Sequence, residues 1–275
     1  MRAESRHALV LVACALIVGC VHPRAAPIDV PLRVMTYNIQ SGHGNLDGTA
    51  AAIRDEHPDV VALQEVDVHW ADRSKFEDQA SLLGEKLGMR VFFAPIYNLS
   101  PDSVGKPIRE FGVAILTRYR VASFENRVIK RLSTQEPNPV PRAMPGLADA
   151  VIDVGGRRVR VLNTHLDYRA DPRVRALQVA DILRYIGDET SPTILMGDLN
   201  AEPDAPELQQ LFARFTDAWL PTAGAGKTYP AEDPKKRIDY VLVSTHFAVR
   251  AARVPATQAS DHRPVMADLT LLRRR

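Results

Sequence analysis

Several apolar segments of the sequence end in a side chain that can bind a cation or move a proton. These segments end at Asn38, Glu65, His165 and Asp198, and Asn200 follows just after the last of them. An apolar run that stops at a carboxylate, an amide or an imidazole is typical of a buried strand that delivers a polar group to a cleft. We expect these strand ends to meet in one site.

The donor set favours a hard divalent cation. Glu65, Asp198 and Asp261 offer carboxylate oxygens, and Asn38 and Asn200 offer amide oxygens. Oxygen donors of this kind suit an octahedral ion that keeps several waters, so we expect Mg²⁺, with Mn²⁺ able to replace it. A zinc site would more often use histidine or cysteine ligands.

Two imidazoles complete the candidate cluster: His165, in the sequence Asn-Thr-His-Leu-Asp, and His262, in Ser-Asp-His-Arg-Pro. Each feature is weak when taken alone, because a polar residue at a strand end is usually a turn or cap residue. The segment 197–200 fits a simple turn with a left-handed Asn, and Asp261 fits a cap. Only convergence of these residues in space distinguishes a site from such turns.

Composition indicates a folded enzyme in one domain. The chain has 275 residues, 45% of them hydrophobic and 25% charged, without low-complexity tracts. The 35 Lys and Arg residues nearly balance the 33 Asp and Glu residues, so no field of the whole protein attracts polyanions. This balance argues mildly against a processive or nonspecific nuclease.

The apolar periodicity predicts a mixed α/β fold. Helices are expected at 46–57, near 80–87, at 171–186 and at 207–212, and strands at 33–38, 60–65, 90–94, 113–116, 121–129, 148–154, 159–165, 194–196, 238–243 and 265–271. A Gly155-Gly156 pair between two β-rich runs indicates a hairpin. The simplest packing is two sheets face to face with helices outside. Segments 97–110 and 133–145 are expected to be loops that border the site.

The N-terminus is typical of an exported lipoprotein. Arg2 and Arg6 precede an apolar segment, 8–19, which is shorter than the ~20 residues of a membrane-spanning helix. The segment ends in Ile-Val-Gly-Cys20, which resembles a bacterial lipobox, so we predict lipidation of Cys20. Cys14 fits the same pattern but leaves too little apolar core. A plain secretory signal or an uncleaved anchor are the other interpretations.

This interpretation divides the chain into a signal peptide (1–19), a tether (20–31) and a folded domain (32–272). It predicts a location outside the cytoplasm, at the membrane of a bacterial cell envelope. Both cysteines of the chain lie in the N-terminal segment, so disulfides do not hold the folded part together. The domain is expected to be a monomer stabilised by burial.

Taken in order, a series of motifs over about residues 32–272 resembles the endonuclease/exonuclease/phosphatase superfamily. The motifs are Thr36-Tyr-Asn38, Leu63-Gln-Glu65, Asn163-Thr-His165, Gly197-Asp-Leu-Asn200, Arg237-Ile-Asp239-Tyr240 and Ser260-Asp-His262. The resemblance implies a four-layer α/β sandwich, with two mixed, mainly antiparallel sheets face to face and helices outside. It also implies divalent-metal-dependent hydrolysis of phosphate esters, in a family that includes nucleases, inositol-phosphate phosphatases and neutral sphingomyelinases.

The resemblance assigns a metal side of the site. By motif, Glu65 resembles the principal metal ligand, assisted by Asn38 and Asp261. Asp198 and Asn200 resemble the pair that orients the attacking water and the phosphate.

The resemblance also assigns a catalytic side. His262 resembles the catalytic histidine, Asp239 the carboxylate that fixes its ring, and His165 the imidazole that holds a phosphate oxygen. A carboxylate beside His262 favours the imidazolium form. His262 is either the base or a cationic stabiliser, and Asp198 is the rival base.

Arg142 is a candidate phosphate clamp through its planar guanidinium, with a surface-loop arginine as the alternative. Two departures from the family pattern concern the substrate rather than the cation site. Val113 stands where many relatives have Asn, and segment 119–121 lacks a proline that is common there.

Three functions follow from the sequence. The first is a metal-dependent phosphodiesterase or phosphatase that acts on an exported phosphate ester such as a lipid head group or a phosphorylated polyol. The second is an extracytoplasmic DNase, which the charge balance does not favour. The third is a lipid-anchored binding module that keeps the fold without turnover. The paired Asp239 and His262 argue against the third.

Overall fold

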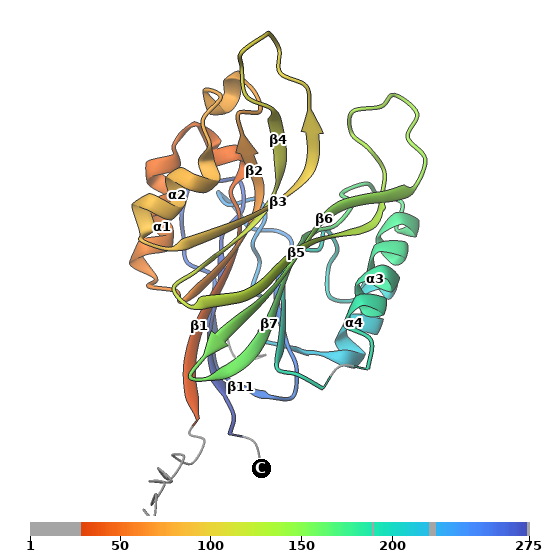
Figure 1. Cartoon of the computed structure of the whole chain (residues 1–275). Coiled ribbons are helices and arrows are strands. Elements are labelled where there is room, and N and C mark those ends of the chain that lie inside the picture. The colour runs from red at the N-terminus through yellow and green to blue at the C-terminus, as the bar shows by residue number, and fades with distance from the viewer. Residues whose placement is uncertain (1–28, 189, 220–223, 274–275) are drawn as a thin grey trace, which may run out of the picture.

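The computed structural model describes residues 29–188, 190–219 and 224–273. It contains two six-stranded sheets packed face to face (Figure 1). The first sheet has the order β11 (Phe247–Arg253), β12 (Val265–Leu271), β1 (Val30–Asn38), β2 (Val60–Val68), β4 (Arg109–Thr117) and β3 (Arg90–Leu99). The second has the order β5 (Arg120–Arg131), β6 (Arg142–Val154), β7 (Arg157–His165), β8 (Thr193–Asp198), β10 (Asp239–Val243) and β9 (Thr216–Asp217).

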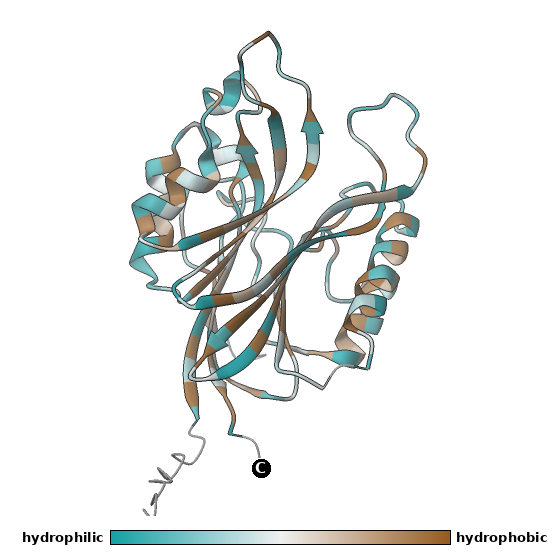
Figure 2. Cartoon of the chain, in the orientation of Figure 1, coloured by the Kyte–Doolittle hydropathy of each residue, from teal (hydrophilic) through white to brown (hydrophobic). Residues whose placement is uncertain are grey.

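Helices cover the outer faces and complete the four layers. α1 (Leu46–Asp55) and α2 (Gln79–Leu87) lie on the first sheet, and α3 (Arg173–Ile186) and α4 (Gln209–Arg214) lie on the second. The largest apolar cluster fills the space between the sheets, and two further clusters lie beneath the helices. Figure 2 shows hydrophobic residues alternating along the strands. The predicted four-layer sandwich is confirmed.

Parallel pairing at the centre of each sheet sets the position of the site. β1 runs parallel to β2, with Asn38 opposite Gln64, and β7 runs parallel to β8, with His165 opposite Asp198. Parallel neighbours end at the same edge of a sheet. The carboxyl ends of these strands therefore meet at one edge of the sandwich, as the sequence predicts.

Some elements differ from the expected ones. β3 and β4 pair as far as Leu99 and Arg109, and β6 begins at Arg142, so the expected loops shrink to 100–108 and 132–141. Backbone pairing across the hairpins, rather than apolar periodicity, holds these polar ends of the strands. The structure also adds the edge strands β9 and β11, which the sequence pattern does not indicate.

The described ends of the chain lie together at the end of the sandwich opposite Asn38 (Figure 1). There the backbone N–H of Arg273 donates a hydrogen bond of 2.8 Å to Oδ1 of Asp29. β1 begins at Val30, two residues before the expected start of the domain. Within the described residues, no helix is long and apolar enough to cross a membrane.

Gly197 shows how closely the central strands approach each other at the site. A Cβ at this position would lie 2.0 Å from the carbonyl oxygen of Thr164 on β7, and its φ of 149° is unfavourable for other residues. We expect Gly197→Ala to lower the free energy of unfolding by about 2–4 kcal/mol, measured by urea denaturation.

Gly156 provides the control. Its φ is also positive, at 76°, but a Cβ there would have no neighbour within 4 Å. Gly156→Ala should therefore cost only the backbone strain, about 1–2 kcal/mol. Equal losses in the two variants would contradict the close approach of β7 and β8 at Gly197.

Candidate active site

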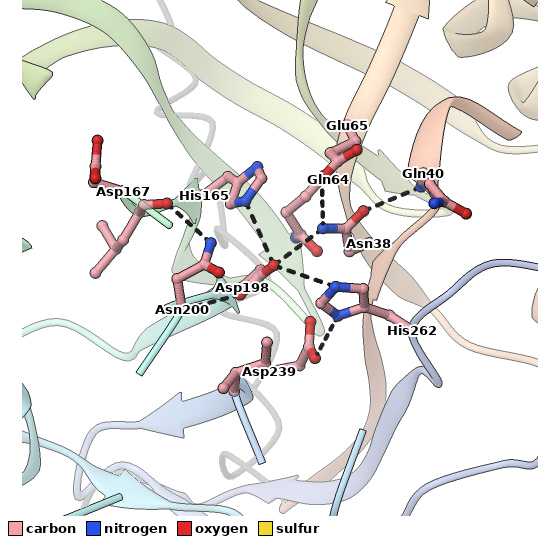
Figure 3. A network of polar contacts seen from close by, with 12 residues as sticks. Asn38, Gln40, Gln64, Glu65, His165, Asp167, Asp198, Asn200, Asp239 and His262 are labelled. Carbon is pink, nitrogen blue, oxygen red and sulfur yellow. Dashed lines mark hydrogen bonds and ion pairs between the residues drawn. The ribbon is translucent and has the colours of Figure 1, made fainter. Parts of the chain in front are cut away.

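The predicted site residues converge between the two sheets (Figure 3). A cleft of about 590 Å³ opens over them, and its lining includes Glu65, His165, Asp198, Asn200, Asp261 and His262. Asn38 and Asp239 lie beside the cleft and contact these residues through hydrogen bonds. Residues scattered along the sequence therefore form one cluster, which the simple turn interpretation does not explain.

The carboxylate of Asp198, at the end of β8, is the centre of the cluster and is buried. Its Oδ2 accepts a hydrogen bond of 3.0 Å from Nδ2 of Asn38. Nε2 of His165 lies 3.4 Å and Nε2 of His262 lies 3.7 Å from the same oxygen. Its Oδ1 accepts a 2.9 Å bond from the backbone N–H of Asn200. The carboxylate is thus surrounded by nitrogen atoms from both sheets.

His262 is held by Asp239, the first residue of β10. Nδ1 of His262 lies 2.9 Å from Oδ2 of Asp239, and both side chains are buried. This contact fixes the ring and leaves Nε2 directed at Asp198, as Figure 3 shows. The ring of Tyr229 packs against the imidazole with 4.8 Å between the ring centroids.

The neighbouring carboxylates favour the charged form of His262. Burial alone would lower its pKa, but the negative charges of Asp239 and Asp198 outweigh burial and raise the pKa to about 10. Burial raises the pKa of Asp239 in turn, and His262 opposes that shift. We place the shared proton on His262, because Asp198 attracts it as well. His262 is then an imidazolium with a donor on each ring nitrogen.

Glu65 lies at an irregularity in β2. The pairing of β2 with β4 shifts between Leu63 and Val66, and Glu65 has a φ of 55°, in the left-handed region. Such bulges redirect a side chain next to a functional site. Here the bulge places the Glu65 carboxylate at the cleft, where its Oε1 accepts a 3.1 Å hydrogen bond from Nδ2 of Asn38.

Glu65 and Asp261 form the oxygen-rich side of the cleft, and Asn38 lies beside it with Nδ2 toward Glu65. Both carboxylates are only partly buried, and they line the same cavity. The Ser260 hydroxyl contacts the backbone oxygen of Asn38 at 2.7 Å and Oδ1 of Asp261 at 3.3 Å, so it connects this side to β1. The amide oxygen of Asn38 accepts a bond from the N–H of Gln40. Carboxylate and amide oxygens beside a water-accessible cavity fit a Mg²⁺ or Mn²⁺ ion that retains waters.

Asp198, Asp239 and His262 also offer atoms within 4.8 Å of one another, which is close enough for a metal. We interpret this group as a charge network instead. A protonated imidazole has no free lone pair for a cation, and His262 is the imidazole of this group. The oxygen-rich side is therefore the better metal site.

His165 and Asn200 are oriented by backbone contacts. Nδ2 of Asn200 donates to the carbonyl of Leu166 at 3.1 Å, and Asn200 has a φ of 50°. The carbonyl of His165 accepts a 2.8 Å bond from the buried guanidinium of Arg131, which also binds the carbonyls of Pro145 and Gly146. No sequence motif indicated Arg131, because its partners are backbone atoms brought together by the fold.

The structure does not bring Arg142 to the cleft. Its side chain is half exposed at the start of β6 and pairs with both carboxylate oxygens of Glu136. This placement matches the surface-loop alternative, so the phosphate clamp stays a prediction without structural support. Cys20 lies outside the described residues.

The cleft lining also contains polar residues that the sequence patterns did not indicate: Tyr168, Arg175, Glu202, Asp204, Tyr229 and Lys236. Lys236 belongs to a basic run, 235–237, and such runs are most often solvated faces. It lies beside the site because its backbone pairs with Tyr229, next to His262. The basic run was thus the available signal, but only the fold shows that Lys236, rather than Lys235 or Arg237, lines the cleft.

This arrangement can stabilise negative charge that develops on a phosphate. The imidazolium of His262, the imidazole of His165 and the carboxylates of Glu65 and Asp261 line one cavity. Figure 3 shows both imidazoles and Glu65. Fixed donors and a cation lower a barrier when they are already oriented toward the developing charge. Phosphoryl transfer depends mainly on such positioning and electrostatics.

Solved structures of other proteins share this fold. An endonuclease/exonuclease/phosphatase from Beutenbergia cavernae is 28% identical, with a TM-score of 0.70 over 88% of this chain and 72% of that chain. A mannosyl-6-phosphatase from Bacteroides thetaiotaomicron is 16% identical, with a TM-score of 0.64 over 86% of this chain and 99% of that chain. The human Nocturnin catalytic domain with bound sulfate is 22% identical, with a TM-score of 0.62 over 91% and 99%. No curated protein gives a significant sequence match.

A family model gives the assignment. The model of the Endonuclease/Exonuclease/phosphatase family matches residues 35–262, most of the chain and nearly all of the sandwich. The match includes every strand end that contributes to the cleft. The chain therefore belongs to the endonuclease/exonuclease/phosphatase family.

Proposed function

We propose that this protein is a divalent-metal-dependent phosphodiesterase or phosphatase. Enzymes of the family are in general hydrolytic on phosphoesters. The observation that carries the proposal is the buried pair of His262 and Asp239, directed at Asp198 beside the oxygen-rich side of the cleft. Buried charges are costly unless they are paired, and this group of charges opens onto a cavity rather than closing a core.

Glu65, Asn38 and Asp261 would hold the cation, and Mg²⁺ fits these donors best. When bound, the ion supplies positive charge for a non-bridging phosphate oxygen and for the leaving group. The other side chains of the site then have separate roles. His165 donates to a phosphate oxygen, and His262 donates from Nε2 while Asp239 holds its ring. In this state His262 is a cationic stabiliser rather than a base, so Asp198 is the candidate that orients and deprotonates water.

The charged residues that line the cleft favour a substrate with few negative charges. Besides the site residues, the lining includes the carboxylates of Glu202 and Asp204 and the basic residues Lys236 and Arg175, and Arg175 is already paired with Glu207. A polyanion along this wall would meet like charge. We therefore favour a small phosphate ester over nucleic acid.

One prediction of the proposed function concerns the reaction. The protein should hydrolyse bis-p-nitrophenyl phosphate or a phospholipid with Mg²⁺ or Mn²⁺, and EDTA should abolish the turnover because the cation balances charge in the transition state. Plasmid DNA should be cleaved poorly. Plasmid cleavage that is lost in His262→Ala would indicate the DNase, and absence of metal-stimulated turnover on all three substrates would indicate the binding module.

Another prediction of the proposed function concerns the charge network of Asp198, Asp239 and His262. His262→Ala and Asp198→Ala should each lower kcat by about a hundredfold or more, the usual scale for a lost acid-base group. The circular dichroism spectrum should be unchanged. His57→Asn is a matched control, because His57 is exposed after α1 and lies outside the cleft. A near-normal rate in either site variant would refute its assigned role.

We further propose that the protein is exported and lipid-anchored through Cys20, on the basis of the N-terminal sequence alone. Cys20→Ser should abolish incorporation of labelled fatty acid in a bacterial host and leave the rate on a dissolved substrate unchanged. Cys14→Ser is the control and should keep the label. A labelled Cys20→Ser protein would instead point to Cys14.

A further inference from the structure

Two amide side chains directly below the cleft join the sheets. Gln64 on β2 and Asn163 on β7 are fully buried, and Nε2 of Gln64 donates a 2.7 Å hydrogen bond to Oδ1 of Asn163. β2 and β7 belong to different sheets, so this bond crosses the interior of the sandwich. We call this pair the amide bridge. The proposed mechanism gives it no task.

The amide bridge interrupts the run of apolar inward-facing residues in both strands, at one level of the core between the sheets. On β2 the inward positions are Val60, Ala62 and then Gln64, and on β7 they are Val159, Val161 and then Asn163; the four apolar residues all belong to the cluster between the sheets. Burying an amide costs free energy unless all its polar atoms find partners. An apolar pair would fill the same place without this requirement, so the amides need another explanation.

The bonds of Asn163 supply that explanation. Its Nδ2 donates to the carbonyl of Leu63 at 2.9 Å and to the carbonyl of Ala114 at 2.8 Å. Leu63 and Ala114 are the last regular pair of the β2–β4 ladder before the shift that contains Glu65. A side chain of the second sheet thus holds the backbone of the first sheet where the bulge begins.

The amide bridge also reaches β1. Nε2 of Gln64 lies 3.1 Å from Oγ1 of Thr36, two residues before Asn38. The bridge therefore touches the strands that carry Asn38, Glu65 and His165. Asn38 and Glu65 belong to the metal side of the cleft. His165, the candidate donor to a phosphate oxygen, belongs to the other side, which we call the phosphate side.

We propose that the amide bridge is a positioning device that sets the spacing between the metal side and the phosphate side of the site. This inference rests on the proposed function. Gln64 and Asn163 touch no reacting group, and they act through the backbone that carries Glu65 and His165. A fully bonded network of amides restrains this spacing in direction as well as distance, whereas apolar contacts restrain it less.

The test uses Gln64→Met and Asn163→Leu in the full-length chain, purified in detergent. Each replacement keeps roughly the shape of the side chain and removes its bonds. Thr164→Val is the local control, because Thr164 is buried next to Asn163 and its hydroxyl has no hydrogen-bond partner among the residues that the structure describes. Val154→Ala is the stability control, because it opens space at the far end of the same core.

We expect the Kd for Mn²⁺ to rise by about tenfold or more in both bridge variants. The Kd is measured by calorimetry on the metal-free protein. With saturating Mn²⁺, kcat on bis-p-nitrophenyl phosphate should also fall by about tenfold or more, because small displacements of positioned groups are costly. Both controls should stay within about twofold of wild type in both measurements, whatever stability they lose in urea.

The proposal would be overturned if the bridge variants had the same Mn²⁺ affinity and kcat as Val154→Ala at comparable stability. The amides would then contribute only to folding. If Asn163→Leu does not fold, Gln64→Met decides, since it leaves the bonds to the β2 and β4 carbonyls in place. The two proposals can fail separately. A wild-type protein without metal-stimulated turnover would refute the proposed function, and Mn²⁺ affinity would still decide the role of the bridge.

Discussion

The buried negative charge of Asp198 is the constraint to which the rest of the structure responds. Its carboxylate lies in the seam between the sheets and needs donors, because an unpaired buried charge costs several kcal/mol. Nδ2 of Asn38 on the first sheet donates a hydrogen bond to it, and the imidazoles of His165 on the second sheet and His262 in the segment before β12 lie within 4 Å. The sandwich satisfies this charge only when both sheets are correctly placed. Folding and assembly of the cleft are therefore one event.

Much of the fold could be predicted because its central strands carry their own signal. Apolar runs that end in Asn38, Glu65 and Asp198 indicated both the strands and their common edge, and the two parallel pairs confirmed it. The edge strands were harder. β11, 247–253, contains two arginines and three alanines and has no strict alternation, and its pairing with β12 is what makes it a strand. Long-range pairing of this kind leaves little trace in a local window of sequence.

The candidate site divides in the same way. Its polar residues could be predicted because each follows a buried strand, and their convergence needed only the shared edge. Arg131 and Lys236 could not, because one binds backbone carbonyls from distant segments and the other enters the cleft through a loop pairing. Arg142 shows the opposite failure. Its residue type suited a phosphate, but Glu136 across the loop takes up its charge, and no spacing rule reveals that partner.

The two ends of the described residues lie at the end of the sandwich opposite the cleft. Asp29 and Arg273 are tied together at one pole, and the nine residues of β1 separate that pole from Asn38 by about 30 Å. A support joined directly at Asp29, whether a bead or a fusion partner, would therefore lie on the side of the sandwich away from the mouth of the cleft. The mouth would look outward into the surrounding medium. A reporter joined after Arg273 would crowd the support and leave the entrance open.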